Sequence, residues 1–146
     1  MSSVAYVDDC EVMFVGGGQA ELSLLLIEDH EDTRISVAHL LRNRGCRVVE
    51  AGSAREARGI LETLSFDGIL VDLGLPDQDG HTFAAELRND PKFSQRTAFI
   101  ATTGFADRRH REQSEQAGFV AHLVKPYPIE ALWSAIAAIK ASVGAK

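Results

Sequence analysis

The sequence predicts an α/β fold in which a five-stranded parallel sheet is covered by helices on both faces. Two observations predict it. Short apolar runs alternate five times with segments that have helical patterns. The first run is continuously apolar, unlike a strand with one face exposed to solvent. Polar residues also follow four of these runs directly, which is typical of the ligand-binding edge of such a sheet.

The first three elements are expected between residues 24 and 50. Leu24–Ile27 is typical of a strand that is buried on both faces of a parallel sheet. Apolar residues at helical spacing then predict a helix over 32–44, which Gly45 can end. The next apolar run predicts a second strand over 47–50.

The middle of the chain continues the alternation. Ser53 is expected to cap a second helix, and Glu56 three residues later completes a capping box. This helix should run to about residue 64. A third strand is expected over 66–71, and a loop containing glycine and proline then leads to a helix over 81–89.

Four more elements complete the fold. A fourth strand is expected over 98–102, and a polar helix with a weak apolar face over 107–117. A fifth strand should follow over 119–124. Pro128 opens the last helix, because proline is favoured in the first turn and apolar residues then recur at helical spacing.

The regular alternation of elements begins only at residue 22, and this sets the expected domain boundaries. Residues 1–21 contain the triple glycine Gly16–Gly18. Ordering three glycines in a helix or strand costs much conformational entropy, so we expect a flexible extension. Residues 22–142 should form one folded domain. A short C-terminal tail, 143–146, is expected to follow.

The composition disfavours several classes of protein. The net charge is −6, whereas nucleic-acid-binding domains usually present a basic surface. No apolar run approaches the roughly 20 residues that cross a bilayer, and the N-terminus lacks the pattern of a signal peptide. Cys10 and Cys46 belong to no CxxC motif. We therefore expect a cytoplasmic protein with no membrane segment, direct nucleic-acid contact, zinc site or disulfide framework.

Polar side chains stand at the ends of four predicted strands. Glu28 and Asp29 follow the first strand, Asp72 the third, Thr103 the fourth and Lys125 the fifth. Because ligands of open α/β sheets bind at the carboxyl ends of the strands, these groups should converge at one edge of the sheet.

The chemistry of such a cluster is restrictive. Three carboxylates a few ångströms apart repel one another, and a divalent cation relieves this repulsion. Mg²⁺ favours carboxylate and carbonyl oxygens together with water, and would leave positions open for phosphoryl oxygens. Lys125 would neutralise another phosphoryl oxygen and Thr103 would donate a hydrogen bond to a third. The centrally placed Asp72 is then the candidate nucleophile for an in-line attack on phosphorus.

Four stretches together form a specific pattern. They are Leu-Leu-Leu-Ile-Glu-Asp-His (24–30), Ile-Leu-Val-Asp-Leu-Gly-Leu-Pro-Asp-Gln-Asp-Gly (69–80), Ile-Ala-Thr-Thr-Gly-Phe (100–105) and His-Leu-Val-Lys-Pro-Tyr (122–127). On these residues the sequence from Leu22 to about Lys140 resembles a response-regulator receiver domain of bacterial two-component systems. The resemblance implies a flavodoxin-like sheet with strand order 2-1-3-4-5.

The resemblance implies a role for each residue at the predicted edge. Asp72 would be the phosphoacceptor. Asp29 and Asp72 would bind Mg²⁺ directly, together with the backbone carbonyl of Gly74, and Glu28 would act through water or a longer reach. Lys125 would pair with the phosphoryl group.

The resemblance also implies a switch and its partners. Thr103 would be the switch hydroxyl, with Thr102 as the open alternative. His122 stands where many family members have a switch aromatic residue, so the chain departs from the family at this position. The phosphoryl donor would be a sensor histidine kinase or a phosphotransfer protein. The fourth helix, fifth strand and last helix would form the face that contacts a downstream protein.

We therefore expect a regulatory phosphoacceptor rather than an enzyme, although one that catalyses its own phosphorylation and slow dephosphorylation. Only 21 residues follow Lys125, so output through protein contact or onward phosphotransfer is expected. Two alternatives stay open: a receiver module of a hybrid kinase or phosphorelay, and a pseudo-receiver that only binds. A haloacid-dehalogenase-type phosphatase is disfavoured, because it needs a second acid at position 74, which is Gly.

Overall fold

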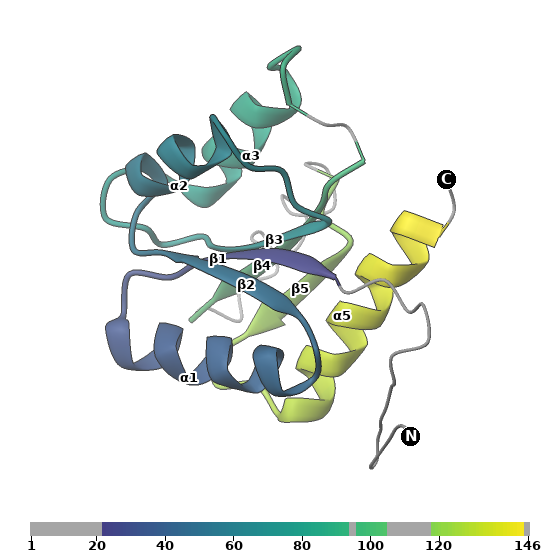
Figure 1. Cartoon of the computed structure of the whole chain (residues 1–146). Coiled ribbons are helices and arrows are strands. Elements are labelled where there is room, and N and C mark those ends of the chain that lie inside the picture. The colour runs from purple at the N-terminus through teal and green to yellow at the C-terminus, as the bar shows by residue number, and fades with distance from the viewer. Residues whose placement is uncertain (1–21, 94–95, 105–117, 145–146) are drawn as a thin grey trace.

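The computed structural model describes residues 22–93, 96–104 and 118–144. These residues form one sheet with helices packed on both faces (Figure 1). The expected N-terminal extension and the helix expected over 107–117 lie outside the described residues. The strands are β1 (Ser23–Ile27), β2 (Arg47–Ala51), β3 (Gly68–Asp72), β4 (Ala98–Thr103) and β5 (Ala121–Val124). The helices are α1 (Glu31–Asn43), α2 (Ala54–Leu61), α3 (Gly80–Arg88) and α5 (Ile129–Gly144).

The strands are all parallel and follow the order β2-β1-β3-β4-β5, which confirms the predicted topology. Leu25 of β1 pairs with Val49 of β2 on one side and with Ile69 of β3 on the other. Strands β3 and β4 are buried along their whole length. Because the strands are parallel, the carboxyl ends of β1, β3, β4 and β5 meet at one edge of the sheet.

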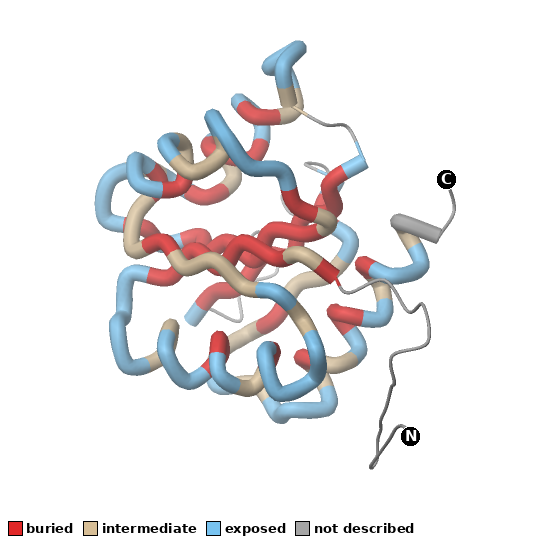
Figure 2. The backbone as a smooth tube through the Cα atoms, in the orientation of Figure 1, coloured by how far each residue is buried: buried red, intermediate tan, exposed pale blue. Residues whose placement is uncertain are grey.

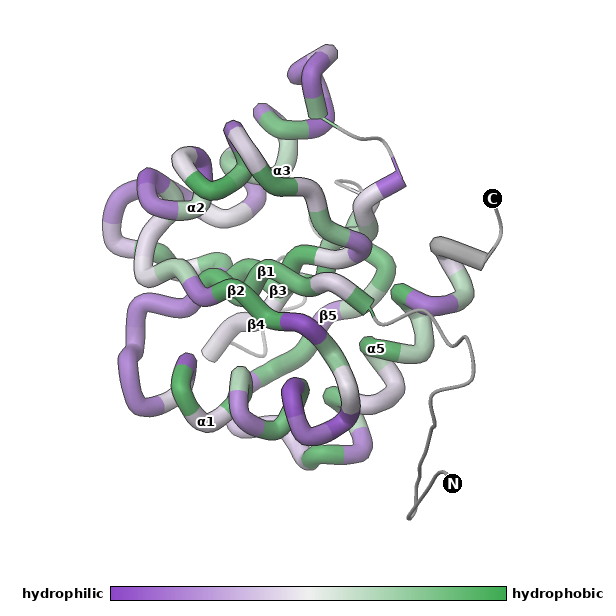
Figure 3. The backbone as a smooth tube through the Cα atoms, viewed as in Figure 1, coloured by the Kyte–Doolittle hydropathy of each residue, from purple (hydrophilic) through white to green (hydrophobic). Residues whose placement is uncertain are grey.

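The sheet is the middle of three layers, with α2 and α3 on one face and α1 and α5 on the other (Figure 1). The core is divided accordingly: Phe83 and Phe99 belong to the cluster under α2 and α3, and Leu41 and Ile139 to the cluster under α1 and α5. Buried and apolar residues gather on the strands and the inner sides of the helices (Figures 2 and 3). Among the residues that the structure describes, no helix combines the length and apolar character needed to span a bilayer.

The start of α2 differs in one detail from the predicted capping box. The Ser53 hydroxyl accepts a hydrogen bond from the Glu56 N–H at 3.1 Å, as predicted. The return bond comes from the Gly52 N–H, which donates to Glu56 Oε1 at 2.7 Å, one residue earlier than the box requires. The backbone at Ser53 is fully extended (φ −158°, ψ 165°), and the long Glu56 side chain reaches past it to the preceding amide.

Two strands begin two residues later than predicted. β3 begins at Gly68, and the Phe66 carbonyl two residues earlier accepts from Thr97 Oγ1 at 2.8 Å rather than from a strand amide. The carboxylate of Asp67 accepts from the Ser23 N–H at 2.9 Å. β5 begins at Ala121 rather than at residue 119. These shifts affect only the ends of the strands that lie away from the predicted site.

Candidate functional site

Asp72 lies at the end of a completely buried strand. Its side chain is only 9% exposed. The Leu73 N–H donates to the Thr102 carbonyl at 2.8 Å, so the pairing of β3 with β4 continues past Asp72. The Gly74 N–H donates to Asp72 Oδ1 at 2.9 Å. Strand pairing fixes the backbone of Asp72, and the following turn holds one of its carboxylate oxygens.

β1 ends in two carboxylates with opposite exposure. Glu28 is buried, and its Oε2 accepts from the His30 N–H at 3.1 Å, whereas Asp29 is exposed. Arg34, on the first turn of α1, donates to the Glu28 carbonyl at 3.1 Å and to Glu50 Oε1 of β2 at 3.3 Å. This arginine ties the start of α1 to the strand end that carries the acids.

Lys125 follows β5 and reaches across the sheet edge to both buried acids. Its Nζ donates to Glu28 Oε1 at 2.6 Å and to Asp72 Oδ2 at 3.1 Å. The Lys125 side chain is 25% exposed, so the ion pairs are largely screened from water. Groups from β1, β3 and β5 therefore share one hydrogen-bonded cluster, as the strand-end argument predicted.

Burial and ion pairing act in opposite directions on these charges. Burial raises the pKa of Glu28, and the hydrogen bond from Lys125 offsets this only in part. Burial lowers the pKa of Lys125, but hydrogen bonds to Glu28 and Asp72 outweigh it and leave the pKa raised. Lys125 is therefore an ammonium ion at neutral pH. One ammonium cannot neutralise three neighbouring carboxylates, which leaves the edge favourable for a further cation.

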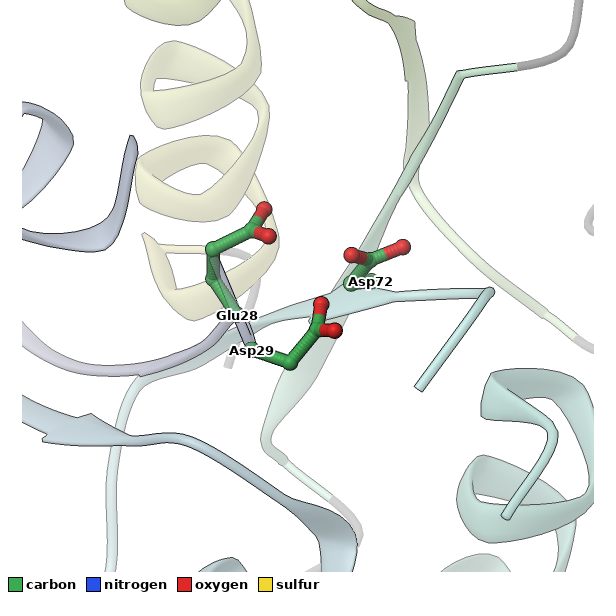
Figure 4. A group of neighbouring side chains, drawn as sticks. All are labelled: Glu28, Asp29 and Asp72. Atoms are coloured by element: carbon green, nitrogen blue, oxygen red, sulfur yellow. The ribbon is translucent and has the colours of Figure 1, made fainter. Parts of the chain in front are cut away.

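The three acids fit a divalent metal ion. One carboxylate oxygen from each of Glu28, Asp29 and Asp72 lies within 4.8 Å of the others. Figure 4 shows their carboxylates gathered around a common space at the ends of β1 and β3. Two oxygens on opposite sides of one Mg²⁺ ion are about 4.2 Å apart, so small shifts or a bridging water would complete such a site. The donors are all hard oxygens, which suit Mg²⁺.

The loop after β3 turns back close to Asp72. The Gly80 N–H donates to the Leu73 carbonyl at 3.1 Å. A Cβ atom at Gly80 would lie 2.8 Å from both the Asp72 carbonyl oxygen and Leu73 Cα, so only glycine allows this approach. At Gly74 a Cβ atom would meet only Asp72 Oδ1, at 3.7 Å, which leaves space beside the carboxylate.

Comparison with known proteins decides the family. The model of the response regulator receiver domain matches residues 24–137. The chain belongs to this family. It is 35% identical over 115 residues to the transcriptional regulatory protein PdtaR of Mycobacterium tuberculosis, covering 77% of this chain and 54% of that protein. It is 35% identical over 120 residues to the sensor protein TorS of Escherichia coli, covering 80% of this chain and 12% of that protein. The receiver domain thus spans about half, or less, of these curated relatives.

The fold of the receiver domain agrees with solved structures. The receiver domain of the sensor histidine kinase PA1611 from Pseudomonas aeruginosa is 30% identical, with a TM-score of 0.72 over 86% of this chain and 99% of that chain. That protein was solved with a magnesium ion coordinated in its active-site cleft. The chain is therefore a receiver domain of two-component systems, a family of regulatory phosphoacceptor domains.

The residues predicted to switch this receiver domain lie on the neighbouring strands. Thr103 is the last residue of β4, is buried, and accepts the Lys125 N–H on its carbonyl at 2.6 Å. Thr102, the alternative hydroxyl, is also buried and pairs in register with Asp72. His122 is half-buried in β5. The pairing of β4 with β3 keeps both threonines beside the strand that ends in Asp72.

Two residues beside the site were not predicted from the sequence. The helical pattern around Arg34 does not indicate its role, because its partners lie outside the helix: the Glu28 carbonyl after β1 and the Glu50 carboxylate in β2. Tyr127 is half-buried; burial raises its pKa, and the charges of Lys125 and Glu28 also act on it. Its place two residues after Lys125 was the one available signal that it lies near the ion pairs.

Proposed function

We propose that Asp72 accepts a phosphoryl group from the phosphohistidine of a sensor kinase or phosphotransfer protein. One carboxylate oxygen of Asp72 bonds to phosphorus while the bond from phosphorus to the imidazole nitrogen breaks. The electron pair of that bond goes to the imidazole, which leaves as a neutral ring because its other nitrogen carries a proton. Asp72 is then an acyl phosphate.

The proposed cation is Mg²⁺, held by the carboxylates of Asp29 and Asp72 and the carbonyl of Gly74. Glu28 would contribute through water, because its Oε1 accepts from Lys125 and its Oε2 from the His30 N–H. When bound, Mg²⁺ neutralises charge between the carboxylates and the phosphoryl oxygens. The spacing of the three acids and the magnesium ion of the PA1611 receiver domain support this assignment.

Lys125 is proposed to stabilise the transferred group. Its ammonium lies between Glu28 and Asp72, at 2.6 and 3.1 Å, so a small rotation of its stem would bring it to a phosphoryl oxygen on Asp72. This arrangement is the observation that carries the proposal. A cation reaching from β5 to the acids of β1 and β3 prepares the edge for an anion that arrives at Asp72.

The output follows from new charge beside β4. We propose that the Thr103 hydroxyl, or that of Thr102, turns toward the acyl phosphate, and that this biases a two-state equilibrium. His122 would take part in place of an aromatic residue. The face made by β5 and α5 would bind the downstream protein. Slow attack by water on the phosphorus of the acyl phosphate would release inorganic phosphate, regenerate the Asp72 carboxylate and reset the domain in the cytoplasm.

The experiment uses acetyl phosphate, Mg²⁺ and the whole chain, with intact mass as the readout. The parent should gain the mass of one phosphoryl group, and D72N should not. D90N, which changes an exposed aspartate at the far end of α3, is the matched control and should label like the parent. Equal labelling of D72N and the parent would contradict the proposal.

A second role, as an intermediate in a phosphorelay, is favoured by the match to the sensor protein TorS, in which the matched part covers 12% of the protein. In that role the phosphoryl group would pass from Asp72 to a histidine of a phosphotransfer protein. Incubating the labelled chain with such a protein and following the label by mass separates the two roles. A relay module loses its label to the partner, whereas a terminal switch loses it only to water.

A further inference from the structure

The loop between β3 and α3, residues 73–79, is attached by hydrogen bonds to α2, a helix that precedes β3 in the chain. The carboxylate of Asp77 accepts hydrogen bonds from the N–H groups of Ala54 at 3.1 Å and Arg55 at 2.9 Å, both in the first turn of α2. These residues lie more than twenty positions away from Asp77 in the sequence. Asp77, in the loop that follows β3, therefore caps the N-terminus of α2.

The bonds to Asp77 complete the start of α2. The first N–H groups of a helix have no partner within the helix. The Glu56 N–H is bonded to the Ser53 hydroxyl, and those of Ala54 and Arg55 are bonded to Asp77. The hydrogen bond from Arg55, with that from Ala54, lowers the pKa of Asp77 although burial opposes this. Asp77 therefore stays charged at neutral pH, where it suits a helix N-terminus.

A second attachment lies one residue further along the loop. Arg58 of α2 donates through Nη2 to Gln78 Oε1 at 2.7 Å and also pairs with Glu86 of α3. Gln78 Nε2 donates to Glu86 Oε1 at 2.9 Å. The α2 clasp, as we call Asp77, Arg58, Gln78 and Glu86, joins the loop to the two helices that cover the same face of the sheet (Figure 1).

The α2 clasp holds residues 77 and 78 of the loop, whereas Gly74 of the same loop contacts the site. The Gly74 N–H donates to Asp72 Oδ1 at 2.9 Å, and the Gly80 N–H returns to the Leu73 carbonyl at 3.1 Å. Between these two points the loop makes its attachments to α2. The loop that carries Gly74 is therefore held at three places: at Gly74 by Asp72, at Gly80 by Leu73, and at Asp77 by the first turn of α2.

We propose that Asp77 is a positioning residue for the cation site: seated on the first turn of α2, it holds the loop so that Gly74 stays in place beside Asp72. The inference rests on the proposed function, in which the Gly74 carbonyl is a ligand of Mg²⁺. Without the clasp, the loop must be ordered when the cation binds, and that cost weakens binding. The Asp72 nucleophile itself is untouched.

The test measures Mg²⁺ affinity by titrating MgCl₂ into the full-length chain and following backbone amide resonances at the strand ends. D77A should bind Mg²⁺ on the order of tenfold more weakly than the parent, as is usual for a partner outside the direct ligands. D77N keeps one acceptor oxygen, so its Mg²⁺ affinity should lie between those of D77A and the parent. If D77A does not fold, D77N alone provides the test. D90A removes an equivalent exposed aspartate, whose Oδ1 accepts the Lys92 N–H at 2.9 Å, and should match the parent.

The readouts separate positioning from simple stabilisation. Thermal melts establish that each variant is folded at the titration temperature, so loss of stability alone leaves the affinity unchanged. Affinities of D77A and D77N within twofold of the parent would overturn the inference and leave the proposed cation site intact. A parent chain that binds no Mg²⁺ would overturn both.

Discussion

Lys125 and Asp72 are 53 residues apart in the chain, and the Lys125 Nζ lies 3.1 Å from Asp72 Oδ2. The same nitrogen lies 2.6 Å from Glu28 Oε1. Without a phosphoryl group, the lysine is therefore shared, and its shorter bond goes to the acid that is not proposed to react. Phosphorylation would draw it toward the new anion on Asp72. This exchange of partners links the chemistry of the site to the end of β5.

Removal of the ammonium should weaken the fold and strengthen cation binding. K125A leaves Glu28 and Asp72 without their counter-ion, so we expect the free energy of unfolding in EDTA to fall by about 2 kcal/mol. The same loss of positive charge should raise Mg²⁺ affinity by at least about threefold. Urea unfolding and a MgCl₂ titration check the two effects, with K140A, on an exposed lysine of α5, as the control. Weaker Mg²⁺ binding by K125A would contradict the shared-lysine account.

The raised pKa of Glu28 predicts a pH-dependent difference in stability. A raised pKa stabilises the folded state below the ordinary value of 4.5, and this contribution is lost as pH rises through the folded pKa. E28Q has no such loss, so its stability relative to the parent should rise between about pH 4.5 and pH 7. Urea unfolding across this range measures the difference. E62Q removes an exposed charge at the end of α2 and should show no comparable trend; the account fails if E28Q behaves like E62Q.

Mg²⁺ should stabilise the folded chain through Asp29. At ten times its dissociation constant, a ligand that binds only the folded state adds about 1.4 kcal/mol, which corresponds to a rise in Tm of about 5 °C for a domain of this size. D29N should lose this rise. D32N changes an exposed acid in the first turn of α1 and should keep it. Differential scanning calorimetry with MgCl₂ and with EDTA decides, and an undiminished shift in D29N would exclude Asp29 as a ligand.

Gly80 and Gly59 should respond to alanine in opposite ways. In G80A the new Cβ atom would lie 2.8 Å from the Asp72 carbonyl oxygen and Leu73 Cα, so backbone must move, at a cost of about 2 kcal/mol or more. G80A should therefore also label more slowly with acetyl phosphate. In G59A, nothing lies within 4 Å of the new atom, and the helix α2 should gain about 0.5–1 kcal/mol. Equal stability of the two variants would show that the close approach at Gly80 is not required.

The convergence of the site could be predicted from sequence because it follows from topology. Once strands are parallel, residues that end them must meet, and Glu28, Asp72 and Lys125 do so. The order of the two bonds to Lys125 could not be predicted, since it depends on the reach of the Glu28 side chain and on burial. Topology gives the neighbourhood of these groups, whereas side-chain length decides which of them pair.

Local sequence patterns could not predict the contacts between elements that are distant in the chain. Asp77 reads locally as a turn residue, and nothing near it indicates that it caps a helix more than twenty residues earlier. The start of β3 was placed too early because Phe66 is buried like a strand residue, although its carbonyl is taken by Thr97. In both cases a tertiary hydrogen bond overrides a local pattern.

The most direct measurement is the chemical identity of the phosphorylated residue. The chain is labelled with acetyl phosphate and Mg²⁺, reduced with borohydride, which converts an aspartyl phosphate to homoserine, and mapped by peptide mass spectrometry. The account predicts homoserine at position 72, in amounts that fall to background in EDTA and in K125A. Homoserine at position 29, a label on a histidine, or labelling at position 72 that is indifferent to both Mg²⁺ and Lys125 would contradict it.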